Sequence, residues 1–246
     1  MTGAETLAMG VLFFAAAALY SSVGHAGASA YLAVMALFGL APDVMKPTAL
    51  VLNIVVATVA SLKFFRAGLF SWNLFWPFAA TSIPAAFIGG AMTLPARGYK
   101  IVLGVVLLYA AAWMFYSARR SVHAVVSNPP LAAALTWGLV IGLVSGMTGV
   151  GGGIFLSPLL LIIGWAETRR TSAVAAVFIL VNSIAGLLGH LSSIAEVPES
   201  ISLWGLAVLA GGWIGSRHGS TRLAAPVLRQ LLSVVLLVAA LKLIAF

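Results

Sequence analysis

The residues of this chain best suited to chemistry are glycines, which are clustered in two short turns between apolar segments. The first turn spans residues 22–27 (SVGHAG), and the second spans residues 146–153 (GMTGVGGG). Glycine is costly inside a helix, so such a cluster indicates that the backbone bends or closely approaches a ligand. Backbone N–H groups at a helix N-terminus, with the partial positive charge of the helix dipole, form an anion site. The candidate substrate-binding glycines are therefore Gly24, Gly27, Gly149, Gly151, Gly152 and Gly153. The alternative is that these glycines only allow helices to cross closely.

Few polar side chains lie away from the ends of the apolar segments, which narrows the set of substrate ligands. Asn53 and Asn182 lie inside such segments, where an amide is costly unless it faces a partner or a cavity. His190 follows Asn182 by two helical repeats of four residues and shares its stripe. We expect the asparagines either to bind substrate oxygens or to hydrogen-bond between helices. Thr48 and Thr171 begin their segments and are interpreted first as N-caps and second as ligands.

His25 lies inside the first glycine turn and is a candidate for a working histidine. Its unperturbed pKa is near neutrality, so a protonated imidazole would attract an anion and a neutral one would release it. Binding of an anion at this turn would then be coupled to protons. The alternative is a structural histidine, and His123 and His218 are placed in cytoplasmic loops.

The composition is that of a membrane protein. Hydrophobic residues make up 62% of the 246 residues and charged residues 7%, with a mean hydropathy of +1.13, whereas soluble domains carry about 25% charged residues. The chain has no cysteine, which excludes disulfides and thiolate metal sites, and we expect no cofactor and no metal. The net charge of +8 is explained by loop cations that face anionic lipid, so the expected partners include membrane lipid and exclude nucleic acid.

Turn-forming and charged residues divide the chain into ten apolar segments, which predicts an all-α polytopic protein. The segments lie near residues 7–23, 28–39, 47–63, 72–92, 99–117, 131–148, 153–164, 171–191, 201–216 and 226–245. Two of them, 28–39 and 153–164, are too short to cross a hydrocarbon core of about 30 Å. Both follow a glycine turn, which is typical of the discontinuous helices at a transporter midplane.

The two halves of the chain resemble each other in sequence. Residues 105–111 (VVLLYAA) match 234–240 (VVLLVAA), and residues 87–89 (FIG) match 213–215 (WIG). We therefore expect a first five-segment repeat at 1–120, a cytoplasmic linker at 121–130 and a second repeat at 131–246. An odd number of segments per repeat inverts the second relative to the first.

Charge placement agrees with this inversion. With the linker in the cytoplasm, the positive-inside rule holds for Lys63, Arg66, Arg119, Arg120, Arg169, Arg170, Arg217 and Arg222. Lys46, Arg97 and Lys100 fall outside, and both termini are expected to be extracytoplasmic. Glu5 precedes the first segment without any Lys or Arg, so we interpret that segment as a retained helix. Lys46, Arg66 and Arg170 are expected to snorkel to headgroups, or else to attract anions at a vestibule.

The second glycine turn and its surroundings resemble the TauE/SafE family of bacterial sulfite and organosulfonate exporters. Residues 149–153 (GVGGG), with Pro158 and Gly164, fit the family's G-x-G-G-G turn, its proline and its closing glycine. The first half departs from this pattern, because His25 and Ala26 interrupt the glycines, Ala28 replaces the last glycine and Ala33 replaces the proline. The resemblance covers nearly the whole chain. It implies a multi-pass protein of the bacterial inner membrane that carries sulfite, thiosulfate, sulfoacetate, another sulfonate or a further small anion.

Together these patterns predict a secondary transporter that exports a small anion, a sulfur oxyanion or organosulfonate, by alternating access, with one repeat rocking against the other. The chain has no nucleotide-binding motif, and a negative cell interior favours anion efflux by about 2.3 kcal/mol per charge per 100 mV. Uptake by proton symport and a passive anion channel are the alternatives. An enzyme is disfavoured because the five carboxylates lie at segment ends or in loops. A partner-binding subunit is disfavoured because the chain has no charged or proline-rich tail.

Overall fold

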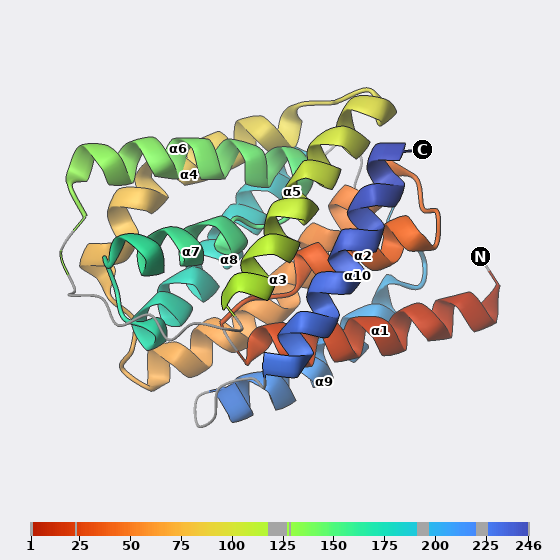
Figure 1. Ribbon diagram of the computed structural model, residues 1–246, viewed down its shortest axis with the longest axis horizontal. Coiled ribbons are helices and arrows are strands. Elements are labelled where there is room, and N and C mark those ends of the chain that lie inside the picture. The colour runs from red at the N-terminus through yellow and green to blue at the C-terminus, as the bar shows by residue number, and fades with distance from the viewer. Residues whose placement is uncertain are drawn as a thin grey trace.

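The computed structural model describes residues 2–22, 24–117, 127, 129–190, 197–219 and 226–245 (Figure 1). These residues form ten helices and no strand: α1 (Gly3–Ser21), α2 (Ala28–Leu37), α3 (Pro42–Arg66), α4 (Trp72–Ala91), α5 (Ala96–Ser117), α6 (Leu131–Thr148), α7 (Gly153–Ile163), α8 (Thr168–Gly189), α9 (Ile201–Gly219) and α10 (Pro226–Ala245). The ten predicted segments are confirmed to within a few residues. Most of the predicted linker lies outside the described residues, as do Arg119, Arg120, His123, Glu196 and Arg222.

The largest boundary difference is at α3, which begins at Pro42 although the apolar segment was predicted to begin at residue 47. Pro42 occupies the first helical turn, where its missing N–H costs nothing, and Asp43 follows it there. The helix therefore starts before the hydrophobic run, and Lys46 lies inside it.

Six of the described helices, α1, α3, α4, α5, α6 and α8, are long and apolar enough to cross a membrane. Large hydrophobic side chains such as Leu206, Leu7 and Phe65 are more than 60% exposed, and their natural surroundings are lipid tails. The chain is thus a multi-pass membrane protein. The short helices α2 and α7 have 10 and 11 residues and span only about 15 Å. Nearly all of α2 is buried by the other helices, whereas α7 is buried at its N-terminal end and exposed at Ile162 and Ile163.

The principal helix pairs each join one helix from the first half of the chain to one from the second. α1 packs on α9, α4 packs on α6, α5 packs on α10, and α3 packs on α8. Figure 1 shows α4 and α6 together along one edge of the molecule and α1 and α9 along the opposite edge. The two halves are therefore interlocked rather than side by side.

Two of these pairs bring helix backbones into direct contact through glycine. A side chain at Gly138, Gly142 or Gly146 of α6 would collide with backbone carbonyls of α4. Gly211 and Gly215 of α9 meet carbonyls of α1 in the same way. Small residues allow such approach in membrane bundles, where dispersion contacts hold helices together. The α4–α6 and α1–α9 pairs therefore have little freedom to slide or separate.

Candidate functional site

The first glycine turn links α1 to α2 and is held by backbone conformations that favour glycine. Gly24 has φ 78° and Gly27 has φ 103°, both in the left-handed region. Gly27 is the N-cap residue of α2, and no side chain caps that helix. Both glycines and the first turn of α2 are buried. Non-helical backbone is thus enclosed by protein, as a membrane requires.

The second glycine turn links α6 to α7 and has the same design. Gly149, Gly151 and Gly152 have φ values of 83°, 81° and 81°. Gly152 is the N-cap of α7, again without a side-chain cap, and residues 148–154 are buried. The N-terminal N–H groups of α7 therefore lie inside the protein with no capping side chain. That arrangement suits an anion, because the helix dipole adds partial positive charge.

Each turn packs on the third helix of the opposite half. A Cβ atom on Gly24 would lie 2.5 Å from Cβ of Ser172 in α8. A Cβ atom on Gly149 would lie 3.0 Å from the carbonyl oxygen of Lys46 in α3. The α3 and α8 helices, which pack on each other, thus each support one turn.

Asn53 is the predicted polar ligand that the structure brings to a turn. It is fully buried, and its Nδ2 donates to the carbonyl oxygen of Val150 at 3.3 Å and to Oγ of Ser183 at 3.4 Å. A Cβ atom on Gly151 would lie 2.8 Å from the same Nδ2. The Oδ1 atom of Asn53 has no partner among the described residues. Asn53 therefore fixes the backbone of the second turn from α3.

Asn182 has a different role from Asn53. Its Nδ2 donates to the carbonyl oxygen of Phe178, one turn earlier in α8, at 2.8 Å. Its Oδ1 is buried without a partner among the described residues. The two asparagines therefore make different contacts, since Asn53 reaches the second turn and Asn182 bonds within its own helix.

The predicted N-cap roles of Thr48 and Thr171 are wrong. The N-cap of α3 is Ala41 and that of α8 is Glu167, so both threonines lie inside their helices. The polar residues ahead of each apolar run are already helical, so each N-cap lies earlier in the chain than predicted. Both hydroxyl groups are buried and have no partner among the described residues.

His25 is partly buried beside the first turn, where aromatic residues surround the backbone. Its ring meets that of Tyr20 edge to face, with centroids 6.4 Å apart. The Tyr31 hydroxyl donates to the carbonyl oxygen of Ala26 at 2.5 Å, and Tyr20 Oη lies 2.9 Å from Oγ of Ser29. The first turn is therefore braced by tyrosines, and the second is braced by the amide of Asn53 and by the Tyr99 hydroxyl, which donates to the carbonyl oxygen of Thr148 at 3.0 Å.

Lys46 is the site residue that the sequence placed incorrectly. It was expected to snorkel to headgroups or else to attract anions at a vestibule, and the snorkelling is wrong, because the side chain is only 4% exposed. Its Nζ donates to the carbonyl oxygens of Gly90 at 2.7 Å, Met92 at 3.3 Å and Gly89 at 3.4 Å. The free carbonyls at the C-terminus of α4 hold the ammonium inside. Nothing in the local sequence distinguishes such a lysine from one that snorkels outward.

His190 caps the end of α8 and reaches the same place as Lys46. Its Nδ1 lies 3.2 Å from the carbonyl oxygen of Gly90, and its Nε2 is buried without a partner among the described residues. The structure thus places His190 with Lys46, away from the amide of Asn182. Arg66 and Arg170 are exposed, as snorkelling side chains would be.

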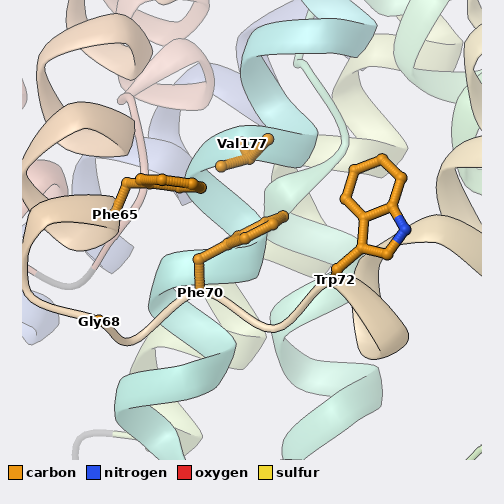
Figure 2. A pocket seen from close by; sticks show the side chains of 5 residues that line it. All are labelled: Phe65, Gly68, Phe70, Trp72 and Val177. Carbon is orange, nitrogen blue, oxygen red and sulfur yellow. The ribbon is translucent and has the colours of Figure 1, made fainter.

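An apolar cavity of about 570 Å³ lies elsewhere, near the loop between α3 and α4. Figure 2 shows Phe65, Phe70 and Val177 facing one another across it, with Trp72 at its side and Gly68 in the loop. None of these residues belongs to either glycine turn. In the described part of the chain, no cluster of His, Asp and Glu is suited to a metal ion.

Comparison with known proteins agrees with this architecture. The sequence profile of the family described as sulfite exporter TauE/SafE matches residues 9–243. A probable membrane transporter protein of Sinorhizobium fredii, y4hK, is 44% identical over 243 residues, which cover 98% of each chain. No solved structure matches the chain. On the profile match and this relative, the chain belongs to the TauE/SafE family of membrane transporters.

Proposed function

We propose that this protein is a secondary transporter that exports a small anion, a sulfur oxyanion such as sulfite or an organosulfonate, across the bacterial inner membrane. The observation that carries the proposal is the pair of buried glycine turns, each leading into a short helix whose N-terminus no side chain caps. The family's printed description as a sulfite exporter supports the substrate class.

The second turn is the stronger candidate for the substrate site. Its left-handed glycines place the backbone of residues 149–153 against α3 and α8, and Asn53 reaches it from α3. Neutral backbone N–H donors bind an anion without a permanent buried charge at that point. Because water is excluded there, each donor interacts with the anion more strongly than it would in solution. We assign substrate contacts to Gly149, Gly151, Gly152, Gly153 and Asn53, and corresponding contacts in the first turn to Gly24, His25 and Gly27. We place Thr48, Thr171, Asn182 and His190 around them as further polar contacts.

We also propose that residues 1–120 and 131–246 are inverted repeats joined by the linker at 121–130. Exchanging the halves converts the α1–α9 pair into the α6–α4 pair, and both pairs are observed. Gly89 of α4 would collide with a carbonyl of α6, and its sequence match Gly215 would collide with a carbonyl of α1. In Figure 1, α1 begins at the right of the view and α6 begins at the left. Inversion would leave both termini extracytoplasmic.

The interlocked packing changes which bodies would move during alternating access. Rocking one half against the other would separate α4 from α6 and α1 from α9, whose backbones touch. We therefore propose two moving bodies that each mix the halves, one built on α1 and α9 and the other on α4 and α6. Hinge and shear motions move packed units of this kind without repacking their interiors.

The test is transport of radiolabelled sulfite, thiosulfate, sulfoacetate or sulfate by purified protein in liposomes. An exchanging carrier should show counterflow, in which an unlabelled anion on the opposite side accelerates uptake of the labelled one. An inside-negative potassium diffusion potential should accelerate efflux. Conductance without exchange acceleration would instead indicate a channel, and flux of none of these anions above empty liposomes would refute the proposal.

Uptake by proton symport is the alternative energy coupling, with His25 as the proton carrier. It predicts that His25→Gln flattens the dependence of transport on pH between about 5.5 and 7.5, the interval around an unperturbed imidazole pKa. A structural His25 would instead lower the yield of folded protein and leave the pH profile of the remainder unchanged.

A further inference from the structure

Lys46 is the one buried Lys, Arg, Asp or Glu side chain among the described residues whose exposure the structure gives. A buried ammonium is costly unless something compensates its charge. No described carboxylate pairs with it, and its partners are the three carbonyl oxygens at the end of α4. The negative end of the α4 dipole offsets part of the charge, and only part, because it amounts to about half an elementary charge. The site therefore retains a positive excess.

His190 supplies a second observation at the same carbonyl oxygen. A carbonyl only accepts hydrogen bonds, so the His190 Nδ1 that lies against the Gly90 oxygen carries the hydrogen. In a neutral imidazole the Nε2 atom is then a bare acceptor. This atom is buried and has no described partner. With a proton it would become a donor beside the Lys46 ammonium.

Lys46 and His190 lie close to the second glycine turn. Gly149 packs on the backbone of Lys46, so the lysine side chain leaves α3 directly beside that turn. The end of α4 packs directly on the backbone of α8, because a side chain on Gly90 would collide with the carbonyl of Gly186.

We propose that Lys46 and His190 form an anion-binding site at the end of α4, and that His190 takes up a proton as the anion binds. The inference rests on the proposed function, because it assigns a charged anion-binding site beside the proposed substrate site at the second glycine turn. The anion would replace the longer Lys46 contacts, those to Gly89 and Met92, and accept a hydrogen bond from the protonated Nε2. The proton comes from water and adds to the lone pair of Nε2.

The coupling of anion to proton follows from charge. The groups that face His190 are Lys46 from α3 and the uncharged end of α4, while α6 carries no titratable residue and the arginines of α8 lie at its other end. A second positive charge beside Lys46 is unfavourable until an anion lies between the two cations. Anion and proton therefore bind together, and affinity rises as pH falls.

The experiment is anion binding to the purified full chain in detergent, followed by calorimetry or by the thermal unfolding midpoint at constant ionic strength. The probes are sodium thiosulfate, sulfite and sulfate, with chloride for comparison, between about pH 5.5 and 8 around the imidazole pKa. Lys46→Gln should weaken binding by about tenfold or more, the effect of losing a charge-assisted hydrogen bond. Lys46→Arg should retain most of the affinity. The matched control is Lys242→Gln, because Lys242 also donates to a helix-end carbonyl, that of Leu37 at 2.9 Å, but is exposed.

His190→Gln keeps an amide donor for the Gly90 carbonyl and removes the titrating group, so its affinity for thiosulfate and sulfate, which do not titrate in this pH range, should no longer depend on pH. Should Lys46→Gln fail to fold, Lys46→Arg and His190→Gln carry the test. The proposal is overturned by unchanged affinity in folded Lys46→Gln or by wild-type pH dependence in His190→Gln. It is also overturned by a wild-type protein that binds none of the probes.

Counterflow separates this inference from the proposed function. A wild-type protein that binds thiosulfate as described but shows no counterflow with any anion would refute transport and leave the site standing. Counterflow with wild-type rates and pH dependence in Lys46→Gln and His190→Gln would refute the site and leave transport standing.

Discussion

At the second turn, an anion has room only because Gly151 and Gly152 carry no side chain. A Cβ atom on Gly151 would lie 2.8 Å from Nδ2 of Asn53, and one on Gly152 would lie 2.9 Å from the ring of Phe178. Both residues also have positive φ, which L side chains rarely adopt. Gly151→Leu and Gly152→Leu should therefore abolish counterflow. Folding is checked by size-exclusion chromatography in detergent.

The matched control for these variants is Gly39→Leu. Gly39 has φ 77°, so the substitution imposes the same backbone strain, but a Cβ atom there meets nothing within 4 Å. We expect Gly39→Leu to retain most of the wild-type flux. Full flux in well-folded Gly152→Leu would show that no anion sits at the second turn.

Asn53 and Asn182 should respond differently to the same substitution. Asn53→Leu leaves the carbonyl of Val150 without its donor, and an unsatisfied buried group costs about 1–3 kcal/mol. It should lower the unfolding midpoint and reduce counterflow about fivefold or more, the effect of that energy on a binding equilibrium. Asn182→Leu breaks only a bond within α8 and should reduce flux less. Equal losses in the two variants would contradict the assignment of Asn53 to the turn.

For single residues, the sequence predicted the features that depend on local backbone conformation. It did not predict side-chain positions that depend on partners distant in the chain. Gly149, Gly151 and Gly152 were recognisable because positive φ is a property that glycine alone tolerates well. The inward course of Lys46 depends on the carbonyls of α4, which follow it by more than forty residues. A local pattern carries no information about such a partner.

Among the helices, the α4–α6 pair depends most on the absence of side chains. Gly142→Leu would drive a side chain into the backbone of Ser82, and overpacking of this kind costs about 1–3 kcal/mol or more. The variant should unfold at a lower temperature than the wild type. Gly205→Leu is the control, because Gly205 lies in α9 and a Cβ atom there meets nothing within 4 Å. Equal midpoints for the two variants would argue against tight α4–α6 packing.

The existence of the helices followed from hydrophobic runs, and their boundaries followed less well. The short α2 and α7 were predicted because the glycine turns ahead of them leave too few apolar residues for a span. The starts of α3 and α8 were predicted late, since Asp43 and Lys46, or Arg169 and Arg170, lie inside a helix despite their charge. The pairing of helices was not predicted, because partners such as α1 and α9 lie far apart in the chain and local patterns do not relate them.

For the whole molecule, the inverted topology stays a prediction that labelling can test. The native chain has no cysteine, so single cysteines give no background. Gly3→Cys and Pro198→Cys should react with an impermeant maleimide from the periplasm. Ser121→Cys and Gly219→Cys should react only when the reagent reaches the cytoplasm; position 121 and the side chain at 219 lie outside the described residues. Labelling of positions 3 and 121 from the same side would contradict the five-plus-five arrangement.

The exchange of partners between halves also sets an order of events during synthesis. α1 enters the membrane first, yet the glycine face of α9 that covers its carbonyls is translated almost last. α4 likewise waits for α6. The first half must therefore persist in the bilayer as loosely associated helices until the second half is inserted. The final structure then closes around α1 and α4 in a late assembly step, and a ribosome that stalls after α5 leaves a fragment with its main helix contacts unmade.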